Sequence, residues 1–348
     1  MSHEDIESVF TKDPISYAID VSGISSRNDI IDVAGSKDVV ASSYAVDISG
    51  GHPSESEMVP VHHIDITQGE KQMYKGQDFT ASGYGTDDAT GEHYLWALLC
   101  DGHGLDTVIH RIREKVRDLN PEAADNFMNK ASPIMALQED LNKLNIRTGS
   151  SGSTCINAKI FKNSCSIESS GDSFVFVLNR GTVIWKNKLH KWGNEEEQAR
   201  LRQMYGTRIS AEKCTAFKIL SHDCLCVDSP SYVKFPPYGT PLATSQALGH
   251  NNMTGLAPDT FIFPLDPAEE YTIIAFSDGV GDMLKEEEMA NIYEMSVPEI
   301  LAFAEARWRQ EWFSVYRENP ENKSPPYKFT RPSDFDDLSC FKVVIKPM

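Results

Sequence analysis

Three short segments of the chain carry aspartates where a strand would begin or end. Residues 94–100 form an apolar run that is followed by Asp101-Gly102-His103-Gly104. Residues 271–277 form a second run, followed by Asp278-Gly279, and Asp336-Asp337 comes shortly before an apolar C-terminal segment. A carboxylate at the end of a buried strand is held rigidly, and the glycine behind it lets the backbone approach a ligand. This pattern indicates a site for a hard cation with a titratable histidine beside it.

Each segment alone is also typical of a strand that ends in an ordinary turn, because Asp-Gly is frequent in turns. Carboxylates gathered without cations would repel one another and raise each other's pKa, and cations reverse that effect. Carboxylates, a backbone carbonyl and water are ligands that suit Mg²⁺ or Mn²⁺. Two such ions about 4 Å apart are known to activate water and to assist displacement at phosphorus. The three segments together therefore favour one shared metal site.

The elements that must position these residues include several strands. The runs 94–100 and 271–277 are expected as buried strands, and the segment before the first run is expected as a hairpin that sets Asp78 near Asp101. Four short segments between residues 153 and 186, separated by turn signals, predict an antiparallel meander. Shorter strand-like pieces are expected at residues 16–21 and 39–46.

Amphipathic helices are expected between the strands. Apolar residues follow Gly104 at helical spacing, Ser132-Pro133 is typical of a helix start, and residues 298–316 also predict a helix. Residues 221–267 are rich in Pro, Gly, Ser and Asn and predict a long surface excursion. The order of elements predicts an α+β fold with two antiparallel sheets packed between helical layers.

The composition is that of a globular protein. The chain has 348 residues, of which 40% are hydrophobic and 24% charged, with a formal net charge of −18. This charge argues against a nucleic acid or an anionic membrane as partner. No apolar stretch approaches the ~20 residues of a membrane span, and no signal peptide is expected. The seven cysteines predict reduced thiols in an intracellular protein. The expected location is cytoplasmic, and the sequence does not exclude a nuclear one.

The motifs, taken in order, resemble those of the metal-dependent serine/threonine protein phosphatases of type 2C, the PPM family. The resemblance covers roughly residues 70–346, and each motif is short. The matching pieces are Gln77-Asp78, Asp101-Gly102-His103-Gly104, Gly152-Ser153-Thr154, Gly171-Asp172-Ser173, His190-Lys191 with Glu196-Glu197, Ser245-Gln246-Ala247-Leu248-Gly249, Ser277-Asp278-Gly279 and Asp336-Asp337-Leu338-Ser339.

The resemblance implies a central antiparallel β-sandwich flanked by helices on both sides. It also implies two Mg²⁺ or Mn²⁺ ions, and attack of a metal-bound water or hydroxide on phosphoserine or phosphothreonine without a phosphoenzyme. The expected domains are an N-terminal extension, residues 1–69, which could belong to the same domain, and a catalytic domain, residues 70–348. The expected partner is a phosphorylated protein, and the chain is expected to be monomeric.

The same resemblance implies a role for each matching residue. Asp101 would bridge the two metals and the Gly102 carbonyl would bind the second. Asp278 and Asp336 would complete the first, and Asp78 would hold a metal-bound water. His103 would be the general acid for the leaving alkoxide. Two further positions would bind a weaker third metal: Asp172 and Asp282.

Several positions depart from the family pattern. Gln77 stands where the family has an acid, and Met73 where it has the arginine that binds substrate phosphate. Lys71 or Lys75 could replace that arginine only as a point charge. Gly281, Gln246 and His250 replace a tryptophan, an arginine and an aspartate. The main hypothesis is an active phosphatase. The alternatives are a weak or inactive pseudophosphatase that binds proteins, and another metal-dependent hydrolase of unrelated topology.

Overall fold

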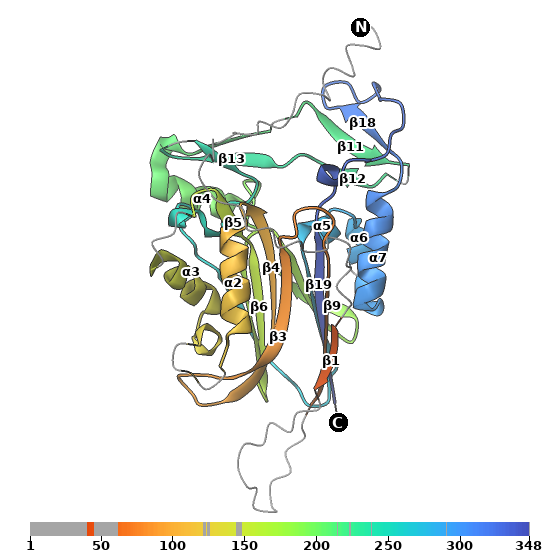
Figure 1. The fold of residues 1–348 in the computed structure, drawn as a ribbon. Helices are drawn as coiled ribbons and strands as arrows, with labels where there is room; N and C mark the ends of the chain where they lie inside the picture. Colours follow the sequence, from red (N-terminus) through yellow and green to blue (C-terminus); the bar gives the residue numbers. More distant parts are fainter. Residues whose placement is uncertain are drawn as a thin grey trace, which may run out of the picture. The chain divides into compact units, whose positions relative to one another are not determined.

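The computed structural model describes residues 40–44 and 62–347, except residues 121–122, 124–125, 144–147, 214, 223, 238 and 290. The strand expected at residues 16–21 lies outside the described residues. Two antiparallel sheets dominate the described part (Figure 1). The first has the order β1-β2-β19-β17-β8-β9, with strands β1 Val40–Tyr44, β2 His63–Lys71, β19 Leu338–Lys346, β17 Tyr271–Phe276, β8 Phe174–Asn179 and β9 Thr182–Lys186.

The second sheet has seven strands in the order β15-β5-β4-β6-β7-β16, with β3 paired to β4. Its strands are β3 Asp78–Thr86, β4 His93–Gly104, β5 Ser151–Ser153, β6 Cys155–Ile160, β7 Ser164–Ser170, β15 Leu248–Gly249 and β16 Asp259–Pro264.

Alternating side chains of β4 explain why residues 94–100 are apolar without interruption. Leu95 and Leu99 point into the core between the two sheets, whereas Trp96 and Leu98 point to the outer face of their sheet. Successive side chains of a strand face opposite sides, so a strand that is covered on both faces needs apolar residues throughout. The sandwich core is completed from the other sheet by residues such as Ile273.

Helices cover the outer face of each sheet. Helices α2 (Thr107–Arg117) and α3 (Pro133–Lys143) pack on the second sheet through residues such as Ile112 and Leu137. Helix α7 (Val297–Trp308) and the short α5 (Asp278–Gly281) pack on the first. In Figure 1, α2 and α3 lie on one side of the strands and α7 on the other. The predicted helix–sheet–sheet–helix arrangement is confirmed.

The remaining elements lie between and beyond these layers. They are η1 Phe127–Asn129, α4 Glu195–Tyr205, η2 Gly206–Arg208, η3 His250–Asn252, α6 Glu286–Met289, η4 Ile292–Glu294, η5 Pro332–Asp334, and two three-stranded sheets formed by β10 Ser210–Lys213, β13 Ser231–Phe235 and β14 Thr240–Leu242, and by β11 Phe217–Ser221, β12 Cys226–Val227 and β18 Trp312–Tyr316. The expected irregular excursion at residues 221–267 therefore contains several short strands.

Two details of the expected fold are wrong. The segments 153–186 do not form one meander, because β7 and β8 belong to different sheets and the chain crosses between them at Gly171-Asp172. The helix expected at residues 298–316 stops at Trp308, and residues 312–316 form a strand paired with β11. The aromatic and β-branched residues of that strand are typical of a sheet.

Strand β2 runs across the expected domain boundary between residues 69 and 70. It pairs with β19 along its whole length, so residues 63–69 are part of the sandwich. The role of the residues before β2 stays a prediction. Among the described residues, none of the helices has the length and apolar character needed to cross a bilayer.

Candidate metal centre

The hairpin of β3 and β4 places two of the expected metal ligands opposite each other. In its register, Asp78 is the direct partner of Asp101, as predicted. The Gly102 N–H donates to the carbonyl of Gln77 at 3.1 Å, and a Cβ at Gly102 would lie 2.9 Å from that oxygen. Glycine is therefore required where the two strands approach. The Thr154 N–H donates to the Asp101 carbonyl at 2.9 Å and holds β4 at this residue.

The other sheet brings Asp278 and Asp336 to neighbouring positions. Strand β17 pairs with β19, and beyond that pairing the Ser277 N–H donates to the Ser339 carbonyl at 3.1 Å. A Cβ at Gly279 would lie 2.1 Å from the Asp337 carbonyl oxygen and 3.3 Å from the Asp336 Cβ. The Asp-Gly pair after β17 therefore packs directly on the Asp-Asp pair before β19.

Electrostatic effects connect the carboxylates of the two sheets. Burial raises the pKa of Asp101 well above its usual range, and Asp278, Asp78 and Asp336 raise it further. Burial also raises the pKa of Asp78, with added contributions from Asp336 and Asp337. For Asp336, burial and the charge of Asp278 raise the pKa to about 7. The carboxylates from β3, β4, α5 and the segment before β19 thus lie close enough to act on one another.

Asp172 and Asp282 lie near Asp278. Asp172 is 5% exposed in the turn between the sheets, and its Oδ2 is 3.4 Å from the Lys191 Nζ. Burial and the charge of Asp278 raise the pKa of Asp172. The same two causes raise that of Asp282 to about 7. All the aspartates expected from the sequence are therefore in one neighbourhood.

The donor atoms of this cluster fit a hard divalent cation. Asp78 Oδ2 and Gln77 Oε1 are buried and have no hydrogen-bond partner among the described residues. A cation would satisfy such oxygens and would lower the raised pKa values of the carboxylates. Within the same residues, however, no group of three or more His, Cys, Asp or Glu side chains is arranged to hold a metal ion. The chain supplies the donors without a closed coordination shell.

Lys75 and Lys191 lie among these carboxylates. Lys75 Nζ is 3.9 Å from Asp336 Oδ1. Burial opposes a charge on Lys75, but Asp336, Asp101, Asp278 and Asp337 together raise its pKa, so the lysine is positively charged at neutral pH. Lys71, the other possible replacement for the missing arginine, forms an ion pair with Glu305 of α7. Of the two lysines that could replace the arginine, Lys75 is therefore the one that lies beside the carboxylates.

Asp337 positions the loop that carries Lys75. Its Oδ1 accepts hydrogen bonds from the N–H groups of Met73 at 2.7 Å and Tyr74 at 3.0 Å, and its Oδ2 accepts one from the Gln77 N–H at 2.9 Å. The side chain is 2% exposed. The sequence marked Asp337 only as the second residue of an Asp-Asp pair, so its role in holding a distant loop was missed.

The half-buried ring of His103 is held in contact with another histidine. Its Nε2 is 2.8 Å from the Nε2 of His250. Burial, His250 and the charge of Lys75 lower the pKa of His103 to about 3, so the ring is neutral at pH 7. A neutral ring must take up a proton before it can protonate a leaving group. The contribution of His250 was missed, because in the sequence it marks only a departure from a motif.

The departures from the family pattern are accommodated locally. A Cβ at Gly281 would lie 2.2 Å from the Phe174 ring, so an aromatic residue at position 281 has no room in this chain. Gln77 Nε2 donates to the Gly104 carbonyl at 2.8 Å and ties the start of β3 to the end of β4. Met73 packs against the core beneath the first sheet.

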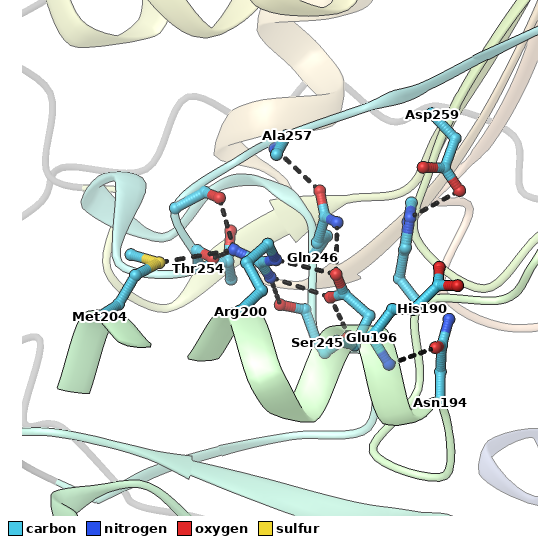
Figure 2. A network of polar contacts seen from close by, with 12 residues as sticks. His190, Asn194, Glu196, Arg200, Met204, Ser245, Gln246, Thr254, Ala257 and Asp259 are labelled. Atoms are coloured by element: carbon cyan, nitrogen blue, oxygen red, sulfur yellow. Dashed lines mark hydrogen bonds and ion pairs between the residues drawn. The ribbon is translucent and has the colours of Figure 1, made fainter. Parts of the chain in front are cut away.

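Several of the other motifs meet in one polar network beside the sandwich (Figure 2). Glu197 of α4 is 4% exposed and binds Arg200 through two hydrogen bonds of 2.8 Å. It also accepts from Ser245 Oγ and from Gln246 Nε2. Gln246 Oε1 in turn accepts from the Ala257 N–H at 2.8 Å. The network fixes both ends of residues 245–257, which include His250.

Known structures similar to this chain include several phosphatases, and the first of those named here supports the fold. The chain is similar to the serine/threonine phosphatase 2C of Toxoplasma gondii, with 14% identity, a TM-score of 0.50, and coverage of 83% of this chain and 98% of that one. A sex-determining protein of Caenorhabditis elegans is 16% identical over 83% of this chain, with a TM-score of 0.49, and the match spans 66% of its length. A serine/threonine phosphatase of Staphylococcus aureus is 16% identical, with a TM-score of 0.45 and coverage of 86% and 100%. No family profile and no curated protein sequence matches the chain.

Proposed function

We propose, from the type 2C phosphatase fold of this chain, that it is a metal-dependent protein serine/threonine phosphatase. The observation that carries the proposal is the gathering of carboxylates from both sheets at one place. Asp78 and Asp101 come from one sheet, and Asp278 and Asp336 from the other, and their charges act on one another. The proposed substrate is a phosphoserine or phosphothreonine of another protein, in the cytoplasm.

The residues proposed to hold two Mg²⁺ or Mn²⁺ ions are Asp101, the Gly102 carbonyl, Asp278 and Asp336, with Asp78 behind them. Asp172 and Asp282 are proposed for a weaker third ion. When bound, such ions lower the pKa of water and neutralise phosphate charge. The unpartnered Asp78 Oδ2 and the raised pKa values of the surrounding carboxylates support this assignment.

Lys75 is proposed to attract the substrate phosphate. Of the two lysines that could replace the missing arginine, Lys75 lies beside Asp336, whereas Lys71 is paired with Glu305. A lysine attracts phosphate as a point charge and lacks the two-pronged hydrogen bonding of arginine. We therefore expect Lys75→Met to raise KM for a phosphopeptide, and Lys71→Met to leave KM unchanged.

The test of the function is Mn²⁺-dependent hydrolysis of a phosphoserine peptide and of p-nitrophenyl phosphate. Wild type is compared with Asp278→Asn and with Asp334→Asn, a control two residues before Asp336. We expect Asp278→Asn to lose at least about 100-fold in rate, as for loss of a central electrostatic group, and the control to keep wild-type activity. No hydrolysis of either substrate by the wild type would overturn the proposal.

The second candidate is a pseudophosphatase that binds proteins. Two observations favour it: His103 is neutral and bonded to His250, and Lys75 and Lys191 lie beside the carboxylates that would hold the metal ions. In that case the wild type binds a phosphopeptide but releases no phosphate, and Lys75→Met weakens the binding.

A further inference from the structure

Two histidine rings meet through their Nε2 atoms at the end of β4. The rings of His103 and His250 have centroids 5.0 Å apart and planes that differ by 23°, and their Nε2 atoms are 2.8 Å apart. That separation is a hydrogen bond, so one of the two nitrogens carries a proton and the other accepts it.

The second nitrogen of His250 decides the direction of this bond. His250 Nδ1 is 3.1 Å from the carbonyl oxygen of Gly149. A carbonyl can only accept, so Nδ1 must carry the proton. His250 is 2% exposed and buried as a neutral ring, which leaves its Nε2 without a proton. His103 must then donate from its own Nε2, and its Nδ1 holds the free lone pair.

The backbone of residues 249–252 is shaped to hold His250 there. His250, Asn251 and Asn252 have φ values of 48°, 49° and 59°, a left-handed conformation that non-glycine residues keep only when their surroundings impose it. The Asn251 side chain and N–H exchange hydrogen bonds with Thr148 at 3.0 and 2.9 Å. The Gly249 N–H donates to Gln138 Oε1 at 2.8 Å.

Gly152 makes room for the contact. In the sheet, Gly152 is paired with His103 on one side and with Gly249, the residue before His250, on the other. A Cβ at residue 152 would lie 2.2 Å from His250 Nε2 and 2.6 Å from His103 Nε2. Only glycine leaves space for the two nitrogens to meet.

We propose that His250 is a positioning residue that commits His103 to the Nε2–H tautomer, with Nδ1 as the nitrogen available for proton transfer. This inference rests on the proposed phosphatase function. In the transfer, Nδ1 takes a proton from solvent. It gives this proton to the seryl oxygen as a water oxygen bonds to phosphorus, the seryl P–O bond breaks and the electron pair of that bond moves to the seryl oxygen. The Nε2–H bond to His250 is kept throughout, so the ring returns to its starting tautomer.

The direct test is the tautomer itself, measured by ¹⁵N NMR of histidine-labelled protein with Mg²⁺, which is not paramagnetic. We expect the wild-type His103 ring to be protonated at Nε2. His250→Ala should move it toward Nδ1–H or a mixture, and His250→Gln, whose amide oxygen can accept, should restore Nε2–H. A wild-type ring protonated at Nδ1, or a tautomer unchanged in His250→Ala, would overturn the proposal. The wild-type spectrum decides even if His250→Ala does not fold.

The kinetic test uses the leaving group. A seryl alkoxide needs a proton, whereas p-nitrophenolate leaves without one. We expect His250→Ala to lower kcat on a phosphoserine peptide by about 10- to 100-fold, part of the usual contribution of general acid catalysis. KM should be unchanged, kcat on p-nitrophenyl phosphate should fall by less than about threefold, and His250→Gln should recover most of the loss. Equal losses on both substrates would contradict the role. If the wild type hydrolyses neither substrate, the phosphatase function fails, while the NMR result still decides the tautomer.

Discussion

Asp337 offers a quantitative test of how the site is held, because one carboxylate accepts three backbone hydrogen bonds from residues 73–77. Asp337→Asn keeps one oxygen, which can accept from Met73 and Tyr74, but turns an NH₂ group toward the Gln77 N–H. A hydrogen bond to a charged acceptor contributes about 1.5–3 kcal/mol, and an unpaired buried donor costs a similar amount. Loss of the charge also relieves the repulsion that raises the pKa of Asp78. We therefore expect a net destabilisation of about 2–3 kcal/mol.

The assay is urea unfolding combined with amide hydrogen exchange. A loss of this size makes exchange at residues 73, 74 and 77 about 30- to 150-fold faster when the loop opens locally. Asp334→Asn is the matched control, because Asp334 also accepts from a backbone N–H, that of Arg331 at 3.0 Å, but at an exposed site. It should cost less than about 1 kcal/mol. Unchanged exchange at residues 73–77 in Asp337→Asn would refute the assigned role.

Three further predictions follow from contacts described above. Gly281→Trp forces a side chain onto the Phe174 ring and should lower the melting temperature by about 4–5 °C, measured by calorimetry, from an overpacking cost of about 3 kcal/mol. Burial opposes ionisation of Glu197, but hydrogen bonds from Arg200 and Ser245 lower the pKa of its carboxyl group below the ordinary value. The stability that the ionised side chain contributes is therefore present above the unfolded-state pKa and is lost as the pH falls through the folded-state pKa. Glu197→Gln should therefore be about 3 kcal/mol less stable at pH 7 and lose less stability than wild type below about pH 4.5, in urea titrations across that range. Mn²⁺ at 100 times its Kd should stabilise the wild type by about 2.7 kcal/mol, and removal by a chelator should reverse this; no shift in unfolding would contradict the metal assignment.

The sequence was sufficient to predict those elements whose patterns lie within a few neighbouring residues. The apolar run before Asp101, the hairpin that pairs it with Asp78 and the strand before Asp278 were all predicted, because alternation and turn residues lie within a few positions of one another. The crossing at Gly171-Asp172 was taken for a hairpin turn, since nothing in those residues shows that β8 joins the other sheet.

The rest of the site depends on contacts between distant residues. Asp337 binds N–H groups more than 250 residues away, and His250 meets His103 across 147 residues. Neither relation leaves a local pattern, because a carboxylate that accepts from backbone amides has no preferred partner type in the sequence. Lys75 and Lys71 were indistinguishable until Glu305 was seen to bind one of them.

The carboxylates lie where the two sheets of the sandwich meet, and each sheet contributes two of them. The charge of the cluster therefore affects how stably the two sheets pack together. In the absence of cations, repulsion between these carboxylates opposes the packing of the two sheets at this end. A cation that neutralises the repulsion would stabilise the packing. Bound ions would thus be retained for holding the sandwich together even in a descendant that had lost catalysis. In this architecture, tight metal binding is therefore evidence for a stabilising role of the ions, and only measured hydrolysis is evidence for an enzyme.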